Sequence, residues 1–499
     1  MLNLIKGTVK HTLIYSLGNV GIKLMGLILL PLYTSKLSTA DYGIWGLIEA
    51  ISMFVIALFS ISLSTAMLRW CSVEKEESKR KSIIFTTFII TIIIVLVLNA
   101  ISQPFTRSFS VLFFDNPEYQ SYLQILFVYA AFEILNMCVL DTIRFREKSL
   151  FYIIIMGFRI LLTIGLNIYF LKYLNMGVKG VILAQLIGSA FFFILALRLI
   201  YKNVNPVFNL KVGKEMIIYS FPLMFSYTSV ILLNVSDRYI LKELRDYSEV
   251  GIYTLGYRLA SVVNMFVITS FQMGFIPIAF KMFDQKEAPR FFKKSLTYYV
   301  FIMMIVVLAM SLFSKEIIIL FSSNQEYYLA YTIVPLIAFA FVFKGIQTIL
   351  ALGFHYVKKT SKIAYIVIVA AVINIGLNFL LIPSLGIYGS ALATIISSII
   401  IVVMFYYFAN KYYPIKYEVG KILLMFVVGI GLYFATFLLK DMNLVLAAII
   451  KMVLMLFFPI ILYFLKFYEP IEIERIKGAW KKWKNLKQLK SNISNIKIH

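Results

Sequence analysis

The chain has 499 residues, of which 61% are hydrophobic and only 14% are charged. Water-soluble domains carry roughly 25% charged residues, so this composition excludes an ordinary soluble protein. The net charge of +24 is compatible with nucleic-acid binding or with a membrane protein whose basic loops face the cytoplasm, and the distribution of the charge favours the second.

Long uncharged stretches predict transmembrane helices. Residues 82–106, 259–280 and 363–410 contain no charge, and a helix needs about 20 apolar residues to cross a bilayer. They lack the alternation of a barrel strand, so the sequence predicts an all-α polytopic membrane protein of about 14 transmembrane helices. The predicted spans are residues 12–34, 42–68, 82–104, 120–143, 149–171, 178–198, 216–238, 251–280, 295–314, 328–354, 363–383, 387–409, 422–439 and 444–465.

The basic residues set the expected orientation. Most of the 48 Lys and Arg fall in alternate loops and in the two ends, for example in residues 69–81 and 281–294. Short Lys- and Arg-rich loops stay in the cytoplasm, so both termini are predicted to be cytoplasmic. The first span lacks a small-residue cleavage site and is expected to be retained.

An internal repeat relates two groups of six spans. GLNIYFLKYLNMGVKG at residues 165–180 resembles GLNFLLIPSLGIYG at 376–389, and YGIWGL from Tyr42 resembles VGIYTL from Val250. Because six is even, both halves cross in the same direction, which predicts a parallel pseudo-two-fold axis along the membrane normal. We expect six-helix lobes at 1–205 and 206–412, two additional helices at 413–466, and a basic amphipathic tail at 467–499.

Three stretches carry a family resemblance. YSLGNVGIKLMGLILLPLYTSKLSTADYGIWGL near the N-terminus, SDRYILKELRDYSEVGIYTLGYRLA in the middle and GLNFLLIPSLGIYGSALATIIS near residue 390 resemble the polysaccharide biosynthesis (Wzx-type) flippases. These belong to the multidrug/oligosaccharidyl-lipid/polysaccharide exporter superfamily. The resemblance implies alternating access in the bacterial cytoplasmic (inner) membrane. It also implies transfer of an undecaprenyl-diphosphate-linked oligosaccharide from the cytoplasmic to the outer leaflet, for O-antigen- or capsule-type polysaccharide.

Polar stripes on four spans predict a central cavity. Asn19 and Lys23 share a face of the first span, and Arg258 lies on the eighth beside Tyr257. Buried charges within spans usually face a cavity or a partner. In the resembled superfamily the first, second, seventh and eighth helices line the cavity between the lobes. We therefore predict that cationic and polar side chains bind the diphosphate-linked sugar: Lys23, Arg258, Arg159, Lys344, Asn19 and Tyr257.

Acidic residues within spans are candidates for coupling transport to H⁺ or Na⁺. They are Glu49, Glu133 and Asp237. Asp237 and Arg238 lie near the predicted end of their span, so an interfacial position or a structural ion pair is an equal alternative. No metal site and no bound cofactor are expected, because the three histidines and two cysteines form no ligand cluster.

The C-terminal tail predicts membrane contact. Apolar and tryptophan side chains recur at helical spacing among lysines in residues 473–490, a pattern typical of a helix lying on anionic lipid. The expected partners are therefore the lipid-linked oligosaccharide and anionic membrane lipids, with a polysaccharide polymerase and chain-length machinery as further partners. We expect a monomer that does not bind nucleic acid.

Three other functions remain open. A lipid II flippase would share the 14 helices and the cationic character. A multidrug and toxin extrusion exporter would share the two-lobe plan but would favour an acidic cavity for cations. A membrane-bound enzyme is disfavoured, because the sequence contains no nucleotide-binding motif and no metal-spaced ligand cluster.

Overall fold

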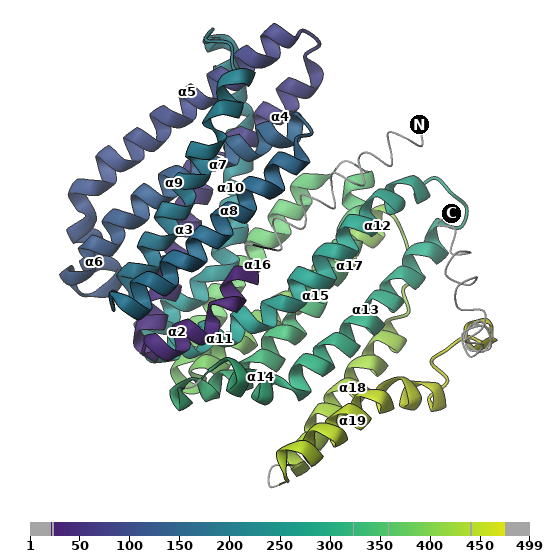
Figure 1. Ribbon diagram of the computed structural model, residues 1–499. Coiled ribbons are helices and arrows are strands. Elements are labelled where there is room, and N and C mark those ends of the chain that lie inside the picture. Colours follow the sequence, from purple (N-terminus) through teal and green to yellow (C-terminus); the bar gives the residue numbers. More distant parts are fainter. Residues whose placement is uncertain (1–20, 22–23, 323, 358, 440–441, 475–499) are drawn as a thin grey trace, which may run out of the picture. The chain divides into compact units, whose positions relative to one another are not determined.

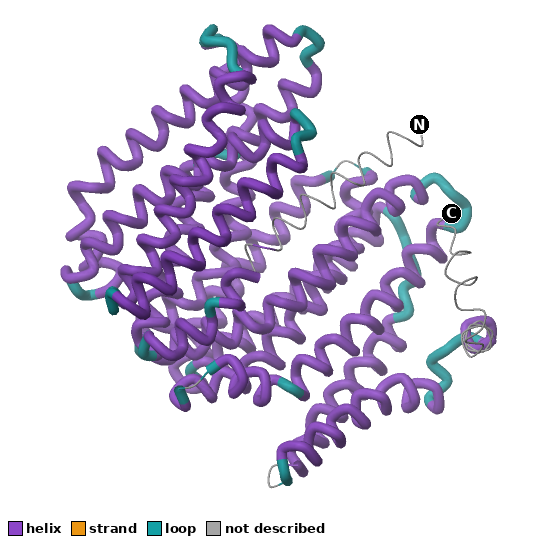
Figure 2. The backbone as a smooth tube through the Cα atoms, viewed as in Figure 1, coloured by secondary structure: helices purple, strands orange, loops and turns teal. Residues whose placement is uncertain are grey.

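The computed structural model describes residues 21, 24–322, 324–357, 359–439 and 442–474. In this part of the chain all regular secondary structure is helical (Figures 1 and 2). The predicted all-α membrane architecture is confirmed: among the described residues, 13 helical segments are long and apolar enough to cross a bilayer. The protein is thus an integral multi-pass membrane protein. About half of the first predicted span, 12–34, lies outside the described residues.

The helices follow the predicted spans closely. In chain order they are α2 (Leu30–Lys36), α3 (Thr39–Phe59), α4 (Leu63–Val73), α5 (Glu77–Ser102), α6 (Thr106–Phe114), α7 (Gln120–Phe145), α8 (Ser149–Ile168), α9 (Gly177–Asn203), α10 (Leu210–Leu244), α11 (Tyr247–Val263), α12 (Thr269–Met282), α13 (Ala288–Leu312), α14 (Ser314–Phe321), α15 (Ile333–Tyr356), α16 (Thr360–Leu385), α17 (Ile387–Tyr412), α18 (Val419–Ala435) and α19 (Leu444–Phe464). Short 3₁₀ segments are η1 (Gln103–Phe105), η2 (Pro117–Tyr119), η5 (Gln325–Thr332) and η6 (Thr436–Leu439), and π-helical turns are η3 (Tyr169–Tyr173) and η4 (Asn264–Ile268).

Local chemistry explains where the helices at the site begin. Ser38 caps α3 by accepting a hydrogen bond from the Asp41 N–H, and the Asp41 carboxylate accepts one from the Ser38 N–H in return. Asp246 caps α11 in the same way through the Glu249 N–H. The first arrangement is a capping box and the second is a single side-chain cap. Both satisfy backbone amide groups that have no intrahelical partner at the start of a helix.

The helices group into two compact units. The first comprises Met1–Phe283 and Ser314–Pro414, and the second comprises Asp284–Phe313 and Ile415–His499. Within the first unit, α2 to α9 come from the first half of the repeat, and α10 to α12 with α14 to α17 come from the second. The four-part division expected from the sequence stays a prediction.

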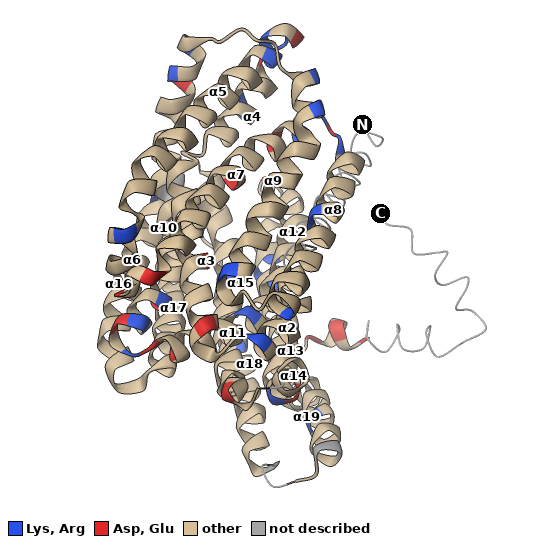
Figure 3. Ribbon diagram, turned by 60° about the vertical axis from the view of Figure 1, so that its left-hand side comes forward, with Lys and Arg blue, Asp and Glu red and all other residues tan. Residues whose placement is uncertain are grey.

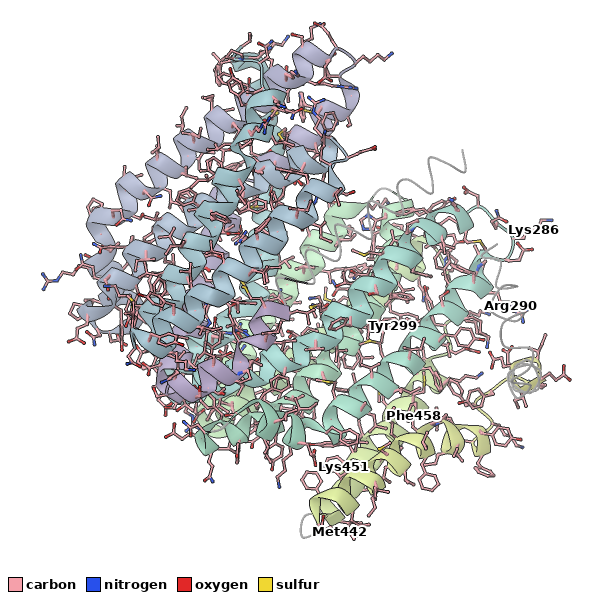
Figure 4. All side chains as sticks on the ribbon, viewed as in Figure 1. Lys286, Arg290, Tyr299, Met442, Lys451 and Phe458 are labelled. Carbon is pink, nitrogen blue, oxygen red and sulfur yellow. The ribbon has the colours of Figure 1, made fainter. Side chains whose placement is uncertain are left out.

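In the second unit, α13 packs with α18 and α19, two helices that follow it by more than 100 residues. Figure 4 labels Tyr299 on α13 and Lys451 and Phe458 on α19. Phe301 of α13 contacts Phe458, with ring centroids 5.9 Å apart. Gly429 of α18 leaves room for Met304, since a Cβ there would lie 2.4 Å from the Met304 Cε.

Charge is sparse along the long helices and concentrated toward their ends (Figure 3). Near the start of α18, Glu418 lies within 4 Å of three ammonium groups, those of Lys293, Lys294 and Lys421. Lys294 also contacts Glu469, with 2.6 Å between Nζ and Oε1. This network joins α13 to the residues on either side of the α18–α19 pair.

Candidate functional site

A cavity of about 410 Å³ lies within the first unit, between helices of both halves. Its walls come from α2, α3, α7 and α9 on one side and from α10, α11 and the π turn η4 on the other. The polar side chains that line it are Tyr33, Trp45, Glu49, Ser52, Tyr129, Gln185, Arg238, Thr254, Tyr257, Arg258, Ser261 and Asn264. We call this space the central cavity.

The Arg258 guanidinium is held by Glu49 across the interface between the halves. Arg258 Nη2 donates to Glu49 Oε2 at 2.5 Å, joining α11 to α3. The guanidinium carbon also lies 5.7 Å from the centre of the Tyr42 ring, within cation–π range. The Glu49 side chain is 32% exposed and that of Arg258 is 15% exposed, so the carboxylate is the more accessible partner.

A second arginine faces the same cavity. Arg238 of α10 lines it, with its guanidinium carbon 4.8 Å from the centre of the Tyr257 ring and Nη1 donating to the Asn234 carbonyl at 3.1 Å. Nη1 also lies 3.6 Å from Asp237 Oδ1. From the sequence, Arg238 is expected to be an interfacial residue or part of a structural ion pair, and its position in the cavity wall is a new finding.

Two helices approach each other closely at one end of the cavity. A Cβ on Gly43 of α3 would lie 1.9 Å from the Tyr247 carbonyl oxygen, and one on Gly251 of α11 would lie 2.0 Å from that of Thr39. Real Cβ atoms do not tolerate such distances, so glycine is required for this crossing. The predicted repeat aligns these two glycines with each other, so the contact is made by equivalent positions of the two halves.

Further contacts between the halves lie at the same end of α3 and α11. The Tyr327 hydroxyl donates to the Leu37 and Ser38 carbonyls at 3.0 and 2.8 Å. The Tyr247 hydroxyl donates to the Phe114 carbonyl at 2.6 Å, and Lys242 is paired with Asp115. According to the predicted orientation these residues lie toward the outer face.

A smaller cavity of about 140 Å³ lies among second-half helices. Asp237 and Lys344 both line it, and Tyr257 lines both cavities. The Tyr253 hydroxyl donates to Asp237 Oδ2 at 2.6 Å, within a region also lined by Asn374. Lys344, expected beside Arg258, therefore faces a different space, which we call the second-half cavity.

Arg159 and Glu133 form a separate ion pair between α8 and α7. The Ser189 hydroxyl of α9 donates to Glu133 Oε1 at 2.6 Å, and the Arg159 side chain is 9% exposed. Neither residue lines the central cavity. The structure thus brings together Glu49, Tyr257 and Arg258 but places Arg159 and Glu133 inside the first-half bundle.

Two predicted binding residues, Asn19 and Lys23, lie outside the described residues. Within the described part, no group of three or more His, Cys, Asp or Glu side chains is arranged to hold a metal ion.

Comparison with known proteins identifies the family. The polysaccharide biosynthesis protein family matches residues 8–283, and the MatE family matches residues 222–380. No curated protein matches the sequence.

Solved structures share the fold at low sequence identity. The lipid II flippase MurJ in an inward closed conformation has a TM-score of 0.75 at 15% identity, covering 92% of this chain and 100% of that one. An inward-facing multidrug resistance MATE family transporter of the MOP superfamily has a TM-score of 0.66 at 15% identity, covering 79% and 94%. The MATE multidrug transporter DinF-BH has a TM-score of 0.57 at 19% identity, covering 82% and 97%. The matched segment exceeds half of the chain, and the chain belongs to the polysaccharide biosynthesis protein family.

Proposed function

We propose that the protein is a flippase that moves an undecaprenyl-diphosphate-linked oligosaccharide from the cytoplasmic to the outer leaflet of the bacterial inner membrane. The observation that carries the proposal is the pair of guanidinium groups, Arg238 and Arg258, in one cavity between the two halves. Among the described lining residues Glu49 is the one carboxylate, while Asp237, which lies 3.6 Å from Arg238 Nη1, faces the second-half cavity. A guanidinium presents several donors to a diphosphate, which suits an anionic cargo.

The neighbouring side chains suit the rest of such a substrate. Gln185, Ser261 and Asn264 line the same cavity and offer amide and hydroxyl groups to sugars. The prenyl chain would remain in the lipid. Lys23 is proposed as a third cationic contact, and Asp237, in the second-half cavity, remains a candidate for coupling to H⁺ or Na⁺.

The direct test is flipping of a fluorescent undecaprenyl-diphosphate-linked sugar by the purified protein in liposomes. Arg258→Ala and Lys23→Ala should each abolish most of the flipping while leaving the protein folded. Arg198→Ala is the matched control, because Arg198 is an exposed arginine on α9 outside both cavities. Flipping by both variants at the wild-type rate would exclude a cationic binding site.

A lipid II flippase is the second candidate, favoured by the full-length match to the MurJ structure. Lipid II is also a prenyl-diphosphate-linked saccharide, so the central cavity does not distinguish the two cargoes. Two bacterial strains separate the cargoes. If this protein restores growth of a strain depleted of its own lipid II flippase, lipid II is supported. If it does not, but restores surface polysaccharide in a mutant that lacks its polysaccharide flippase, the first proposal is supported.

A further inference from the structure

Glu49 and Arg258 form an ion pair that differs from the pair of Glu133 and Arg159. The Glu133 carboxylate accepts from both Arg159 and Ser189, whereas among the described contacts the Glu49 carboxylate accepts one hydrogen bond, from Arg258. Glu49 is also more exposed, at 32% against 21% for Glu133. The Glu49 carboxylate is therefore the less firmly held of the two.

The Glu49 carboxylate occupies a guanidinium group that an anionic cargo would bind. Arg258 and Arg238 are the charged donors of the described cavity wall, and Glu49 already neutralises Arg258. If the carboxylate moves away, the guanidinium keeps its stacking on the Tyr42 ring and remains in the cavity. A diphosphate offers more oxygens and more negative charge than one carboxylate, so it competes effectively for the same guanidinium.

The pair also bridges the two halves near their closest contact. Glu49 follows Gly43 by six residues and Arg258 follows Gly251 by seven, which places the pair about 10 Å from the crossing along the helix axes. Removing this hydrogen bond therefore removes an attachment between α3 and α11 about two helical turns from the crossing.

We propose that Glu49 acts as an internal counter-anion that the substrate diphosphate displaces from Arg258, with two consequences. The displaced carboxylate, left beside a diphosphate, takes up one proton from the buffered solvent, and α3 loses its ion pair with α11. This inference rests on the proposed function, since it requires a diphosphate-bearing cargo. Substrate binding would then both load a proton and weaken the attachment between α3 and α11.

The surroundings of Glu49 favour neutralisation once Arg258 is engaged elsewhere. An unpaired carboxylate in a largely apolar site is costly, and protonation relieves that cost. Among the described residues, the charged and titratable groups around it are Tyr42 on α3, Tyr33 on α2, Tyr129 and, more distantly, Glu133 on α7, Arg238 on α10, and Tyr257 and Arg258 on α11. Of these, Arg238, whose Nη1 lies 3.6 Å from Asp237 Oδ1, is the second cation available to the diphosphate.

The test measures binding of farnesyl diphosphate to the detergent-purified protein by calorimetry, at two pH values and in two buffers of different ionisation enthalpy. The wild-type protein should bind more tightly at the lower pH and take up close to one proton. Glu49→Gln should bind about tenfold more tightly at neutral pH, with no proton uptake, because the competing carboxylate is gone. Glu118→Gln, at an exposed loop position, is the control and should behave as wild type.

Hydrogen exchange supplies a second readout. Exchange at the start of α11 should accelerate when wild type binds farnesyl diphosphate, and Glu49→Gln should show that faster exchange without ligand. Unchanged affinity, proton uptake and exchange in a folded Glu49→Gln protein would refute the inference while leaving the flippase proposal intact. Failure of every variant to bind the diphosphate would instead overturn the proposed function, and this inference with it.

Discussion

Two arginines of this chain are each paired with a glutamate from a neighbouring helix, yet their surroundings differ. Arg159 is fixed by a carboxylate that Ser189 also holds, and its guanidinium lies 5.7 Å from the Phe192 ring centre. Arg258 lines the central cavity beside an exposed carboxylate. We therefore expect the Arg159–Glu133 pair to stabilise the fold, and the Arg258–Glu49 pair to separate when a substrate diphosphate binds Arg258.

Removing Arg159 should therefore destabilise the protein. Arg159→Ala leaves the Glu133 carboxylate buried without its cation, and breaking a buried pair in this way costs about 3–5 kcal/mol. Thermal unfolding in detergent should show a clearly lower midpoint than for Arg258→Ala. The double variant Arg159→Met with Glu133→Leu should recover most of the loss, because both charges are then absent. A low midpoint for the double variant would mean that packing, rather than charge, is responsible.

The site shows what a sequence reveals about single residues. Glu49, Tyr257 and Arg258 line one cavity, as expected for polar and charged side chains within apolar spans, and their roles in binding and coupling stay predictions. Arg238 was missed because it follows Asp237 and was assigned the same environment. Successive residues of an α-helix point about 100° apart, so these neighbours face different cavities, a distinction that depends on which helices surround α10.

Among the helices, the crossing of α3 and α11 depends on two glycines. Gly43→Ala would place a Cβ where the Tyr247 carbonyl now lies and must push the helices apart, at a cost of about 1–3 kcal/mol in the closed arrangement. We expect faster hydrogen exchange at the starts of both helices and impaired flipping. Gly157→Ala on α8 is the control, because nothing lies within 4 Å of its Cβ position. Wild-type exchange in Gly43→Ala would show that this contact does not hold the halves together.

The carboxylates beside α18 should make the second unit sensitive to acid. Burial raises the pKa of Glu418, but the Thr297 hydrogen bond and the ammonium groups of Lys421, Lys294 and Lys293 outweigh it, so the pKa is lowered from 4.5. A lowered folded-state pKa means that the stabilisation is complete above pH 4.5 and is lost as the pH falls through the lower value.

Hydrogen exchange at the start of α18 should accordingly be slow near neutrality and accelerate as the pH falls below 4.5 and through the lowered pKa of Glu418. Glu418→Gln should already exchange faster at neutral pH and should lose much of this dependence. Some pH dependence of exchange will remain in that variant, because the pKa of Glu472 is also lowered. An identical pH profile for Glu418→Gln and wild type would assign the acid response to other groups.

The helices themselves were largely predictable, and their interruptions were not. Hydropathy located the spans because a bilayer imposes both length and composition. The break at Ile61 and Ser62, both with positive φ, divides the predicted span 42–68 into α3 and α4. No glycine or proline marks that break, and the π turn at Asn264–Ile268 likewise has no proline or glycine within it. Such features arise from packing between helices, which a single sequence does not display.

For the molecule as a whole, the distribution of basic residues predicts which loops face the cytoplasm, and this orientation underlies the proposed direction of transport. Lys75 precedes the continuous segment Glu77–Phe114, and Glu118 follows it, so the two residues lie at opposite ends of one crossing. Both are exposed, and the native cysteines Cys71 and Cys138 are buried, which makes single cysteines at these positions selective reporters.

In right-side-out membrane vesicles, a membrane-impermeant maleimide should label Glu118→Cys and should label Lys75→Cys only after permeabilisation. The reason is that the loop around Lys75 carries several basic residues, which are retained on the cytoplasmic side during insertion. The reverse pattern would place the basic loops outside, and the crossing of α3 and α11 at Gly43 and Gly251 would then face the cytoplasm. That result would contradict the orientation on which the proposed direction of transport depends.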